Sequence, residues 1–222
     1  MNLHSQNETL TLVAPIQPYA YTNFNQSVLD ALIWRRKFLD TALTTLMLRT
    51  AALAEVAALL VEAIHSGHKA LVAGNGGSAA EAQHFAAELV GRFKRERLPY
   101  AVLSLTTDTS ILTAIANDYG YQDVFARQVC AFGQPGDVFI AFSTSGESEN
   151  LLRAAQAGHE RSVSVVAITG DCPSSLESLA DITVRVPVVD TALVQEMHMM
   201  VTHVLCDIVE AELATSQKEA AL

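Results

Sequence analysis

Short, continuous apolar runs alternate with segments of helical periodicity along most of the chain. The apolar runs, each bounded by turn residues, predict strands near 69–73, 100–105, 137–142, 163–168 and 181–186. Runs without polar alternation are typical of strands that helices cover on both faces. The segments between them predict helices, the last from about Thr191 to Leu213. This pattern predicts an α/β protein, a three-layer αβα sandwich with a five-stranded parallel sheet.

Further helices are predicted before the first strand. Apolar residues recur at helical spacing over 29–39 and 53–64, so we expect helices that pack outside the sheet or against another subunit. Residues 1–26 are polar, contain Pro15 and Pro18 and lack any period, which predicts a flexible arm. The predicted division is an arm over 1–26, one domain over 27–215 and a tail over 216–222.

Composition narrows the classes of partner and compartment. The chain has 222 residues, half of them hydrophobic, which is enough for a core without disulfides or structural metals. Its formal net charge of -10 opposes binding to nucleic acid or anionic membranes. Charged residues interrupt the apolar helices, so we expect no membrane span. Cys130, Cys172 and Cys206 are far apart, which favours a reducing cytoplasm.

A glycine-rich turn follows the first predicted strand. Residues 74–78 read Gly-Asn-Gly-Gly-Ser, in which glycines permit a tight turn and Ser78 can cap a helix whose free N–H groups attract phosphate. The turn also fits the dinucleotide pattern GxGxxA through Ala79. The pattern requires an acidic residue at a strand end about 20 positions on, whereas Glu96 falls within the charged, solvated run 94–97, which disfavours this interpretation. A turn needed only for packing is the third alternative.

A second turn, after the third predicted strand, is rich in hydroxyl groups. Residues 143–148 read Ser-Thr-Ser-Gly-Glu-Ser and precede a predicted helix. Hydroxyls together with turn N–H groups can fix phosphate oxygens without a lysine. Ordinary helix capping is the alternative, since serine and threonine are common there.

Polar residues recur on one side of the helix that follows the glycine turn. Glu81, His84, Glu88 and Arg92 are three or four positions apart, so His84 and Glu88 can serve one site. Such a pair suits a metal ion or acid/base chemistry, and a solvated helix face is the alternative.

The last predicted helix carries further polar side chains among apolar ones. His198 fits a buried histidine with satisfied hydrogen bonds. Gln195 and His203 are eight residues apart, which places their Cα atoms ~12 Å apart in height on a helix. Spacing alone therefore does not predict a shared site for these two residues.

These motifs occur in the order of a known family. They are Gly74-Asn75-Gly76-Gly77-Ser78, Gln83-His84-Phe85-Ala86-Ala87-Glu88-Leu89, Ala116-Asn117-Asp118, Ser143-Thr144-Ser145-Gly146-Glu147-Ser148 and Gln195-Glu196-Met197-His198. Together they resemble the sugar isomerase (SIS) domain family over about Leu29 to Leu213. The resemblance implies a flavodoxin-like core and a homotetramer with active sites between subunits.

The resemblance also implies a role for particular residues. The phosphate would be held by Ser143, Thr144, Ser145 and Ser148. The residues that line the sugar site would be Asn75, Gly76, Gly77, Ser78, Glu88, Asn117, Asp118 and Gln195. The acid/base pair would be Glu88 and His203, and one zinc ion per subunit would be held by His84, Glu88, Gln195 and His203.

The implied activity belongs to the branch of the family that isomerises heptose phosphates. It would convert D-sedoheptulose 7-phosphate to D-glycero-D-manno-heptose 7-phosphate through an enediol, for heptose and lipopolysaccharide precursors in the cytoplasm. Leu193-Val194 stands where the family usually has Arg-Ile, so the family's substrate contacts at this position are not expected to carry over unchanged. A non-catalytic regulator that binds a DNA replication initiator protein, or a sugar-phosphate-sensing module, is the alternative. The full set of His84, Glu88 and His203 favours the enzyme.

Overall fold

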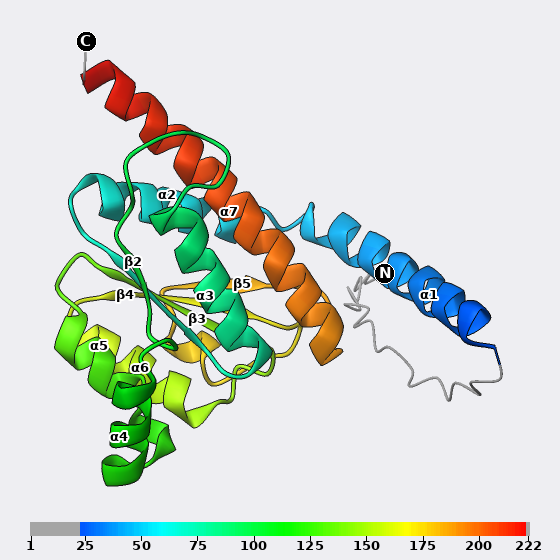
Figure 1. Cartoon of the computed structure of the whole chain (residues 1–222), viewed down its shortest axis with the longest axis horizontal. Helices are drawn as coiled ribbons and strands as arrows, with labels where there is room; N and C mark the ends of the chain where they lie inside the picture. The colour runs from blue at the N-terminus through cyan, green and yellow to red at the C-terminus, as the bar shows by residue number, and fades with distance from the viewer. Residues whose placement is uncertain (1–22, 221–222) are drawn as a thin grey trace, which may run out of the picture.

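The chain folds around one parallel sheet, and the computed structural model describes residues 23–220. The strands are β1 (Ala70–Gly74), β2 (Val102–Ser104), β3 (Val138–Ser143), β4 (Ser164–Thr169) and β5 (Ile182–Arg185). The helices are α1 (Phe24–Leu46), α2 (Ala51–His65), α3 (Gly77–Val90), α4 (Thr109–Tyr119), α5 (Ala126–Phe132), α6 (Glu149–Glu160) and α7 (Thr191–Ala220), with short 3-10 helices η1 (Tyr121–Asp123) and η2 (Glu177–Leu179). Figure 1 shows helices on both sides of the sheet.

The five strands lie in the order β2-β1-β3-β4-β5, and each neighbouring pair is parallel. Every residue of β1 and β3 is buried, as their continuous apolar runs predict. The predicted αβα sandwich with a five-stranded parallel sheet is therefore confirmed. β2 is shorter than the predicted 100–105, because the Tyr100 N–H bonds to the Leu89 carbonyl of α3 (3.1 Å) instead of extending the strand.

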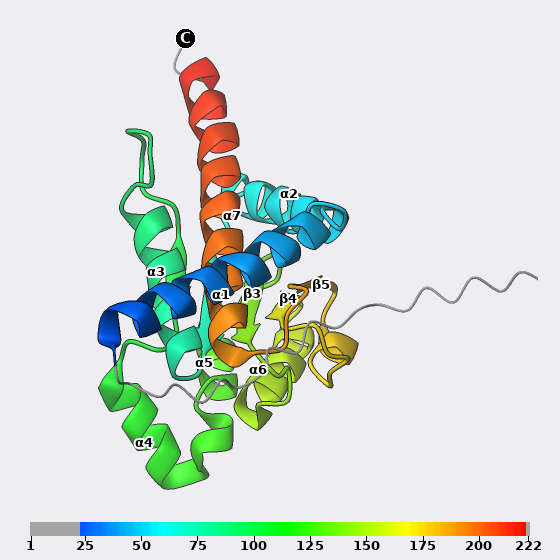
Figure 2. The ribbon, with the colours of Figure 1, turned by 90° about the vertical axis from the view of Figure 1, so that its right-hand side faces the viewer.

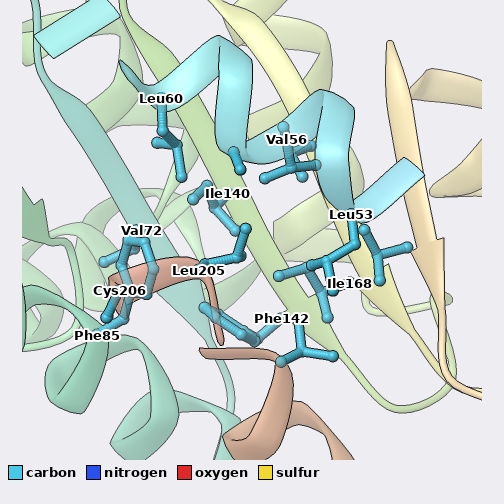
Figure 3. Packing of buried hydrophobic residues seen from close by; sticks show 14 of the residues in the cluster. Leu53, Val56, Leu60, Val72, Phe85, Ile140, Phe142, Ile168, Leu205 and Cys206 are labelled. Carbon is cyan, nitrogen blue, oxygen red and sulfur yellow. The ribbon is translucent and has the colours of Figure 1, made fainter. Parts of the chain in front are cut away.

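The two faces of the sheet carry separate hydrophobic cores. Val138, Ile140 and Phe142 of β3 point toward α2, α3 and α7, and Phe139 and Ala141 point toward α5 and α6. Figure 3 shows the first core, in which α2 lies over β3 and side chains of α7 lie close by. Both cores are built by the alternation of side chains along the strands.

The chain leaves β1 and β3 toward opposite faces of the sheet. β1 continues into α3, which packs in the core of α2 and α7, whereas β3 continues into α6 on the other face. β1 and β3 are neighbours in the sheet. A crevice therefore opens between their carboxyl ends, and ligands of open α/β sheets bind at such a point.

Both ends of the chain differ from the predicted boundaries. α1 begins at Phe24, because the Asn23 side chain accepts the Gln26 N–H at 3.3 Å and caps the helix inside the predicted arm. Residues 1–22 of that arm lie outside the described residues. α7 continues past the predicted end at Leu213 to Ala220, since this segment contains neither glycine nor proline. The predicted tail from 216 is thus helical up to 220, and residues 221–222 lie outside the described residues.

Helix α1 extends from the body of the domain (Figure 1) and crosses α7 (Figure 2). Trp34 and Phe38 pack against the first core, and Arg35 forms an ion pair with Glu196 of α7. Leu32 and Ile33 stay exposed, at 60% and 58%. Among the described residues, no helix combines the length and apolar character needed to cross a bilayer.

Leu60 of α2 tests the packing of this helix on the sheet. Its side chain is fully buried in the first core (Figure 3), so Leu60→Ala removes methyl groups and leaves a cavity. We expect the free energy of unfolding to fall by about 2–5 kcal/mol. Urea titration followed by circular dichroism measures it. Glu55→Ala, at an exposed position of the same helix, should change it by less than about 0.5 kcal/mol. Equal losses from both variants would contradict the packing.

Candidate active site

The glycine turn after β1 forms one wall of the crevice. Gly76 has a φ of 56°, a conformation that favours glycine, and it leads directly into α3. A Cβ atom on Gly77 would collide with the side-chain amide of Gln195, at the start of α7. The lack of a side chain at Gly77 therefore leaves room for the Gln195 side chain against this turn.

The hydroxyl turn after β3 forms the opposite wall. The Ser143 hydroxyl accepts the Gly146 N–H at 3.0 Å, and the Ser145 hydroxyl accepts the Glu147 N–H at 3.2 Å. Ser148 is the N-cap residue of α6, yet its side chain makes no capping hydrogen bond. Bonds within the turn thus explain Ser143 and Ser145, and the Ser148 hydroxyl is left available to a ligand at the N-terminus of a helix.

These two walls enclose a cavity of 300 Å³. It is lined by Asn75, Gly76, Gly77, Ser78, Phe142, Ser143, Thr144, Ser148, Thr191 and Gln195. The structure thus brings together the predicted phosphate and sugar residues of both turns. Ser145 is the exception, because it is exposed and does not line the cavity.

Asn117 and Asp118 lie apart from this cavity. Both are exposed near the end of α4, where the Asn117 amide donates to the Asp118 carboxylate at 2.8 Å. Neither residue lines the 300 Å³ cavity of the two turns. Their contact with the sugar therefore stays a prediction.

An amide pair that sequence reasoning missed joins the two walls. The Asn75 amide donates to the Asn150 side-chain oxygen, and Asn150 donates back to Asn75, both at 2.9 Å. The Tyr121 hydroxyl donates to the same Asn75 oxygen at 3.0 Å. These bonds fix the orientation of the Asn75 side chain and link the glycine turn to the first turn of α6. Nothing in the local sequence around Asn150 indicates this partner.

His84, Glu88 and His203 form a group that can hold a metal ion. The His84 Nε2 lies 3.1 Å from the His203 Nε2 and 3.1 Å from a Glu88 carboxylate oxygen. Their ligand atoms all lie within 4.8 Å of one another. Ligands about 2.1 Å from a tetrahedral zinc ion are separated by ~3.4 Å, so the observed spacing fits such an ion. α3 and α7 together supply a site that the spacing within each helix predicts only in part.

Gln195 lies at the boundary between this group and the cavity of the two turns. It lines the 300 Å³ cavity and a second cavity of 430 Å³, which His84, Glu81 and Glu196 also line. The two cavities meet at Gln195 and Gly77. A ligand held by the hydroxyl turn can therefore extend past Gln195 toward His84.

Glu81 does not belong to a solvated polar stripe. It is only 4% exposed, because its carboxylate faces the Nδ1 atom of His198, 3.3 Å away. His198 is fully buried, and its Nε2 atom has no hydrogen-bond partner among the described residues. The expected burial of His198 in the core is confirmed, whereas the expected satisfaction of its ring nitrogens holds for Nδ1 and not for Nε2. The pair links α3 to α7 one turn away from His84.

Arg97 also differs from the predicted solvated run at 94–97. Its side chain is only 1% exposed, because it pairs with Glu210 of α7 (3.2 Å). Lys94 and Arg95 of the same run stay at the surface, where both contact the Asp207 carboxylate. Only one of these basic residues is thus part of the interior.

Cys206 lies in the core close to Glu88 and Glu210. Burial, together with the nearby Glu88 and Glu210 carboxylates, raises the pKa of its thiol to about 12. A protonated thiol is a poor metal ligand at neutral pH. The metal site therefore depends on nitrogen and oxygen ligands.

Leu193 and Val194, which stand where the family usually has Arg-Ile, do not line the cavity. Leu193 is 1% exposed and Val194 is fully buried, both in the first core. The cavity instead receives Thr191 and Gln195 from this turn of α7. In this chain, Leu193 contributes to packing.

The fold and the site together define a sugar isomerase domain. The SIS domain family matches residues 34–170. The phosphoheptose isomerase of Helicobacter hepaticus is 49% identical over 163 residues, which cover 73% of this chain and 83% of that protein. The phosphoheptose isomerase of Thiobacillus denitrificans is 53% identical over 158 residues, or 70% and 80% of the two chains.

A solved structure agrees with this relationship. The phosphoheptose isomerase of Neisseria gonorrhoeae superposes with a TM-score of 0.77 at 37% identity, covering 85% of this chain and all of that chain (100%). The chain therefore belongs to the phosphoheptose isomerase family of SIS domain proteins, and it is an isomerase.

The group of His84, Glu88 and His203 predicts that the chain binds one divalent ion. We expect one equivalent of added Zn²⁺ to bind tightly, because two imidazoles and a carboxylate converge. His84→Ala should weaken binding at least 10-fold, measured by competition with a chelator dye. His65→Ala, at an exposed histidine of α2, is the matched control and should bind like the wild type. Equal affinity of all three proteins would contradict the assignment.

Proposed function

We propose that the chain converts D-sedoheptulose 7-phosphate to D-glycero-D-manno-heptose 7-phosphate in the cytoplasm, as a step toward heptose-containing glycoconjugates such as lipopolysaccharide. The observation that supports this most is the convergence of Glu88 and His203 with His84, which lines the cavity adjoining Gln195. The identities of about 50% with named phosphoheptose isomerases support the same substrate.

The reaction requires two polar groups on either side of adjacent carbons. A ketose becomes an aldose when a proton leaves C1, the C2 oxygen is protonated to give an enediol, and a proton returns to C2 as the C1 oxygen loses its proton. A carboxylate and an imidazole can accept and donate these protons near neutral pH. We assign these roles to Glu88 and His203.

The hydroxyl turn would hold the phosphate. Thr144 and Ser148 line the cavity at the N-terminus of α6, where unpaired N–H groups and the helix dipole favour an anion. Ser143 and Ser145 shape the turn through their bonds to backbone N–H groups. We assign all four residues to the phosphate site.

The glycine turn would receive the sugar. Asn75 is held by its amide pair, and Gly76, Gly77 and Ser78 bring backbone close to the cavity. Gln195 stands between the phosphate end and His84. An open-chain heptose phosphate would thus extend from Ser148 past Gln195 to the acid/base pair.

The residues present fit a zinc ion at the second end of this path. His84, Glu88 and His203 would hold it, with Gln195 as the fourth ligand, and nitrogen and oxygen ligands suit zinc. When bound, zinc supplies a positive charge that stabilises negative charge on the sugar oxygens.

Direct assay tests the proposed reaction. The purified protein is incubated with sedoheptulose 7-phosphate, and the aldose is followed by NMR. We expect turnover by the wild type, and a loss of about 10²–10⁴-fold in kcat for Glu88→Gln and for His203→Ala, because each removes a proton-transfer group.

Matched controls come from α2. Glu55→Gln and His65→Ala change the same residue types at exposed positions, so their kcat should equal that of the wild type. A folded wild type that produces no aldose would rule out the proposed substrate. Full activity of Glu88→Gln would instead rule out its role.

We further propose a homotetramer with active sites between subunits. Val28, Leu29, Leu32 and Ile33 are all at least 50% exposed on α1, an apolar surface that another subunit would cover. Contact between subunits would also give Asn117 and Asp118, exposed on α4, access to a neighbouring cavity. The structures of relatives support the fold of each subunit.

Light scattering tests the assembly. We expect a mass about four times the chain mass of 23.9 kDa. The double variant Leu32→Glu/Ile33→Glu should lower this mass, because charges would be buried at the interface. Thr44→Glu, at an exposed polar position of α1, should not change it. A monomeric wild type would contradict the proposal.

A further inference from the structure

The loop 91–99 between α3 and β2 contacts the acid/base pair through an aromatic ring. The ring of Phe93 stacks on the imidazole of His203, with 5.5 Å between ring centroids and 14° between planes. The Lys94 ammonium group lies 4.9 Å from the centroid of the same Phe93 ring. A flat ring against the imidazole limits its rotation while its Nε2 atom faces His84.

A buried carboxylate holds the backbone of this loop. Glu210 of α7 is fully buried and accepts the N–H groups of Phe93, Lys94 and Arg95 at 2.9, 2.8 and 2.9 Å. Burial raises the pKa of this carboxyl, but the three N–H donors and Arg97 outweigh burial and lower it below its usual value. The carboxylate therefore stays charged and fixes the residue that carries the stacked ring.

The same carboxylate reaches Glu88 through Arg97. The Arg97 Nε atom lies 3.2 Å from a Glu210 oxygen, and its Nη2 atom donates to the Glu88 carbonyl at 2.9 Å. Arg97 is almost fully buried, so its charge depends on Glu210 for compensation. One ion pair thus holds the last turn of α3 at Glu88 and the loop that carries Phe93.

We propose that Glu210 and Phe93 are positioning residues that align His203 and Glu88 for proton transfer. This inference rests on the proposed function, which assigns the acid/base roles to those two residues. Neither Glu210 nor Phe93 lines the two cavities of the site, so we assign them a role through the loop rather than on the substrate. Misplacement of a catalytic group by 1 Å lowers a rate by up to about 100-fold.

Asp207 provides the matched control. It lies one turn before Glu210 on α7 and contacts the same loop, through Lys94 at 2.7 Å and Arg95 at 2.8 Å. Its side chain is partly exposed, and exposed ion pairs contribute little. Asp207→Asn therefore removes a contact with the loop without removing the buried carboxylate.

Kinetics separate positioning from substrate binding. We expect Phe93→Leu to lower kcat by about 10- to 100-fold with KM within about twofold, and Phe93→Tyr to restore most of the rate because the ring returns. Glu210→Gln should lower kcat in the same way, and Asp207→Asn should leave it within about twofold. If Glu210→Gln does not fold, the Phe93 pair still decides the question.

NMR of the His203 ring protons tests the stack without turnover. In the wild type, the ring current of Phe93 should shift these signals upfield, and Phe93→Leu should return them toward the positions of free imidazole. Phe93→Tyr and Asp207→Asn should keep the shift. A wild type that shows the shift but no turnover would reject the proposed function and leave the stack intact.

The proposal is overturned by wild-type kcat in Phe93→Leu, or by a rise in KM that accounts for its whole effect. It is also overturned if Asp207→Asn lowers kcat as much as Glu210→Gln, since any contact with the loop would then be equivalent.

Discussion

The site depends on one constraint, which is that the neighbouring strands β1 and β3 send the chain to opposite faces of the sheet. α3 and α6 must then diverge, and a crevice opens above the two strand ends, where the start of α7 lines it. The glycine turn and the hydroxyl turn face each other across that space. The reciprocal amide bonds between Asn75 and Asn150 tie the diverging segments together at the same place, so the width of the crevice is set by hydrogen bonds as well as by strand spacing.

The second half of the site depends on contact between α3 and α7. A buried pair lies on either side of the group formed by His84, Glu88 and His203. Glu81 of α3 contacts His198 of α7 on one side, and Arg97 of the loop after α3 pairs with Glu210 of α7 on the other. Buried charges of this kind add little net stability, but each demands its partner. The two helices are therefore held in one register, which is what a shared metal site requires.

The sequence allowed prediction of the features that depend on local pattern. Continuous apolar runs predicted the strands, and the two turns could be assigned to strand ends because glycine and serine change the local backbone there. Features that depend on a distant partner could not be predicted. Glu81 and Arg97 read as solvated because their partners, His198 and Glu210, are more than a hundred residues away. The link between Gln195 and His84 likewise came from the resemblance and not from helix spacing.

The position of α7 in the chain has a consequence for the order in which the protein becomes active. This helix follows all five strands and supplies both His203 and Glu210. During synthesis on the ribosome, these residues are added after all five strands. A chain shortened before α7 would lack Thr191 and Gln195 from the cavity lining, as well as the His203 imidazole and the Glu210 carboxylate. It would also lack Met197, Val201 and Leu205 of the first core, so both the packing of the sheet and the complete site depend on α7.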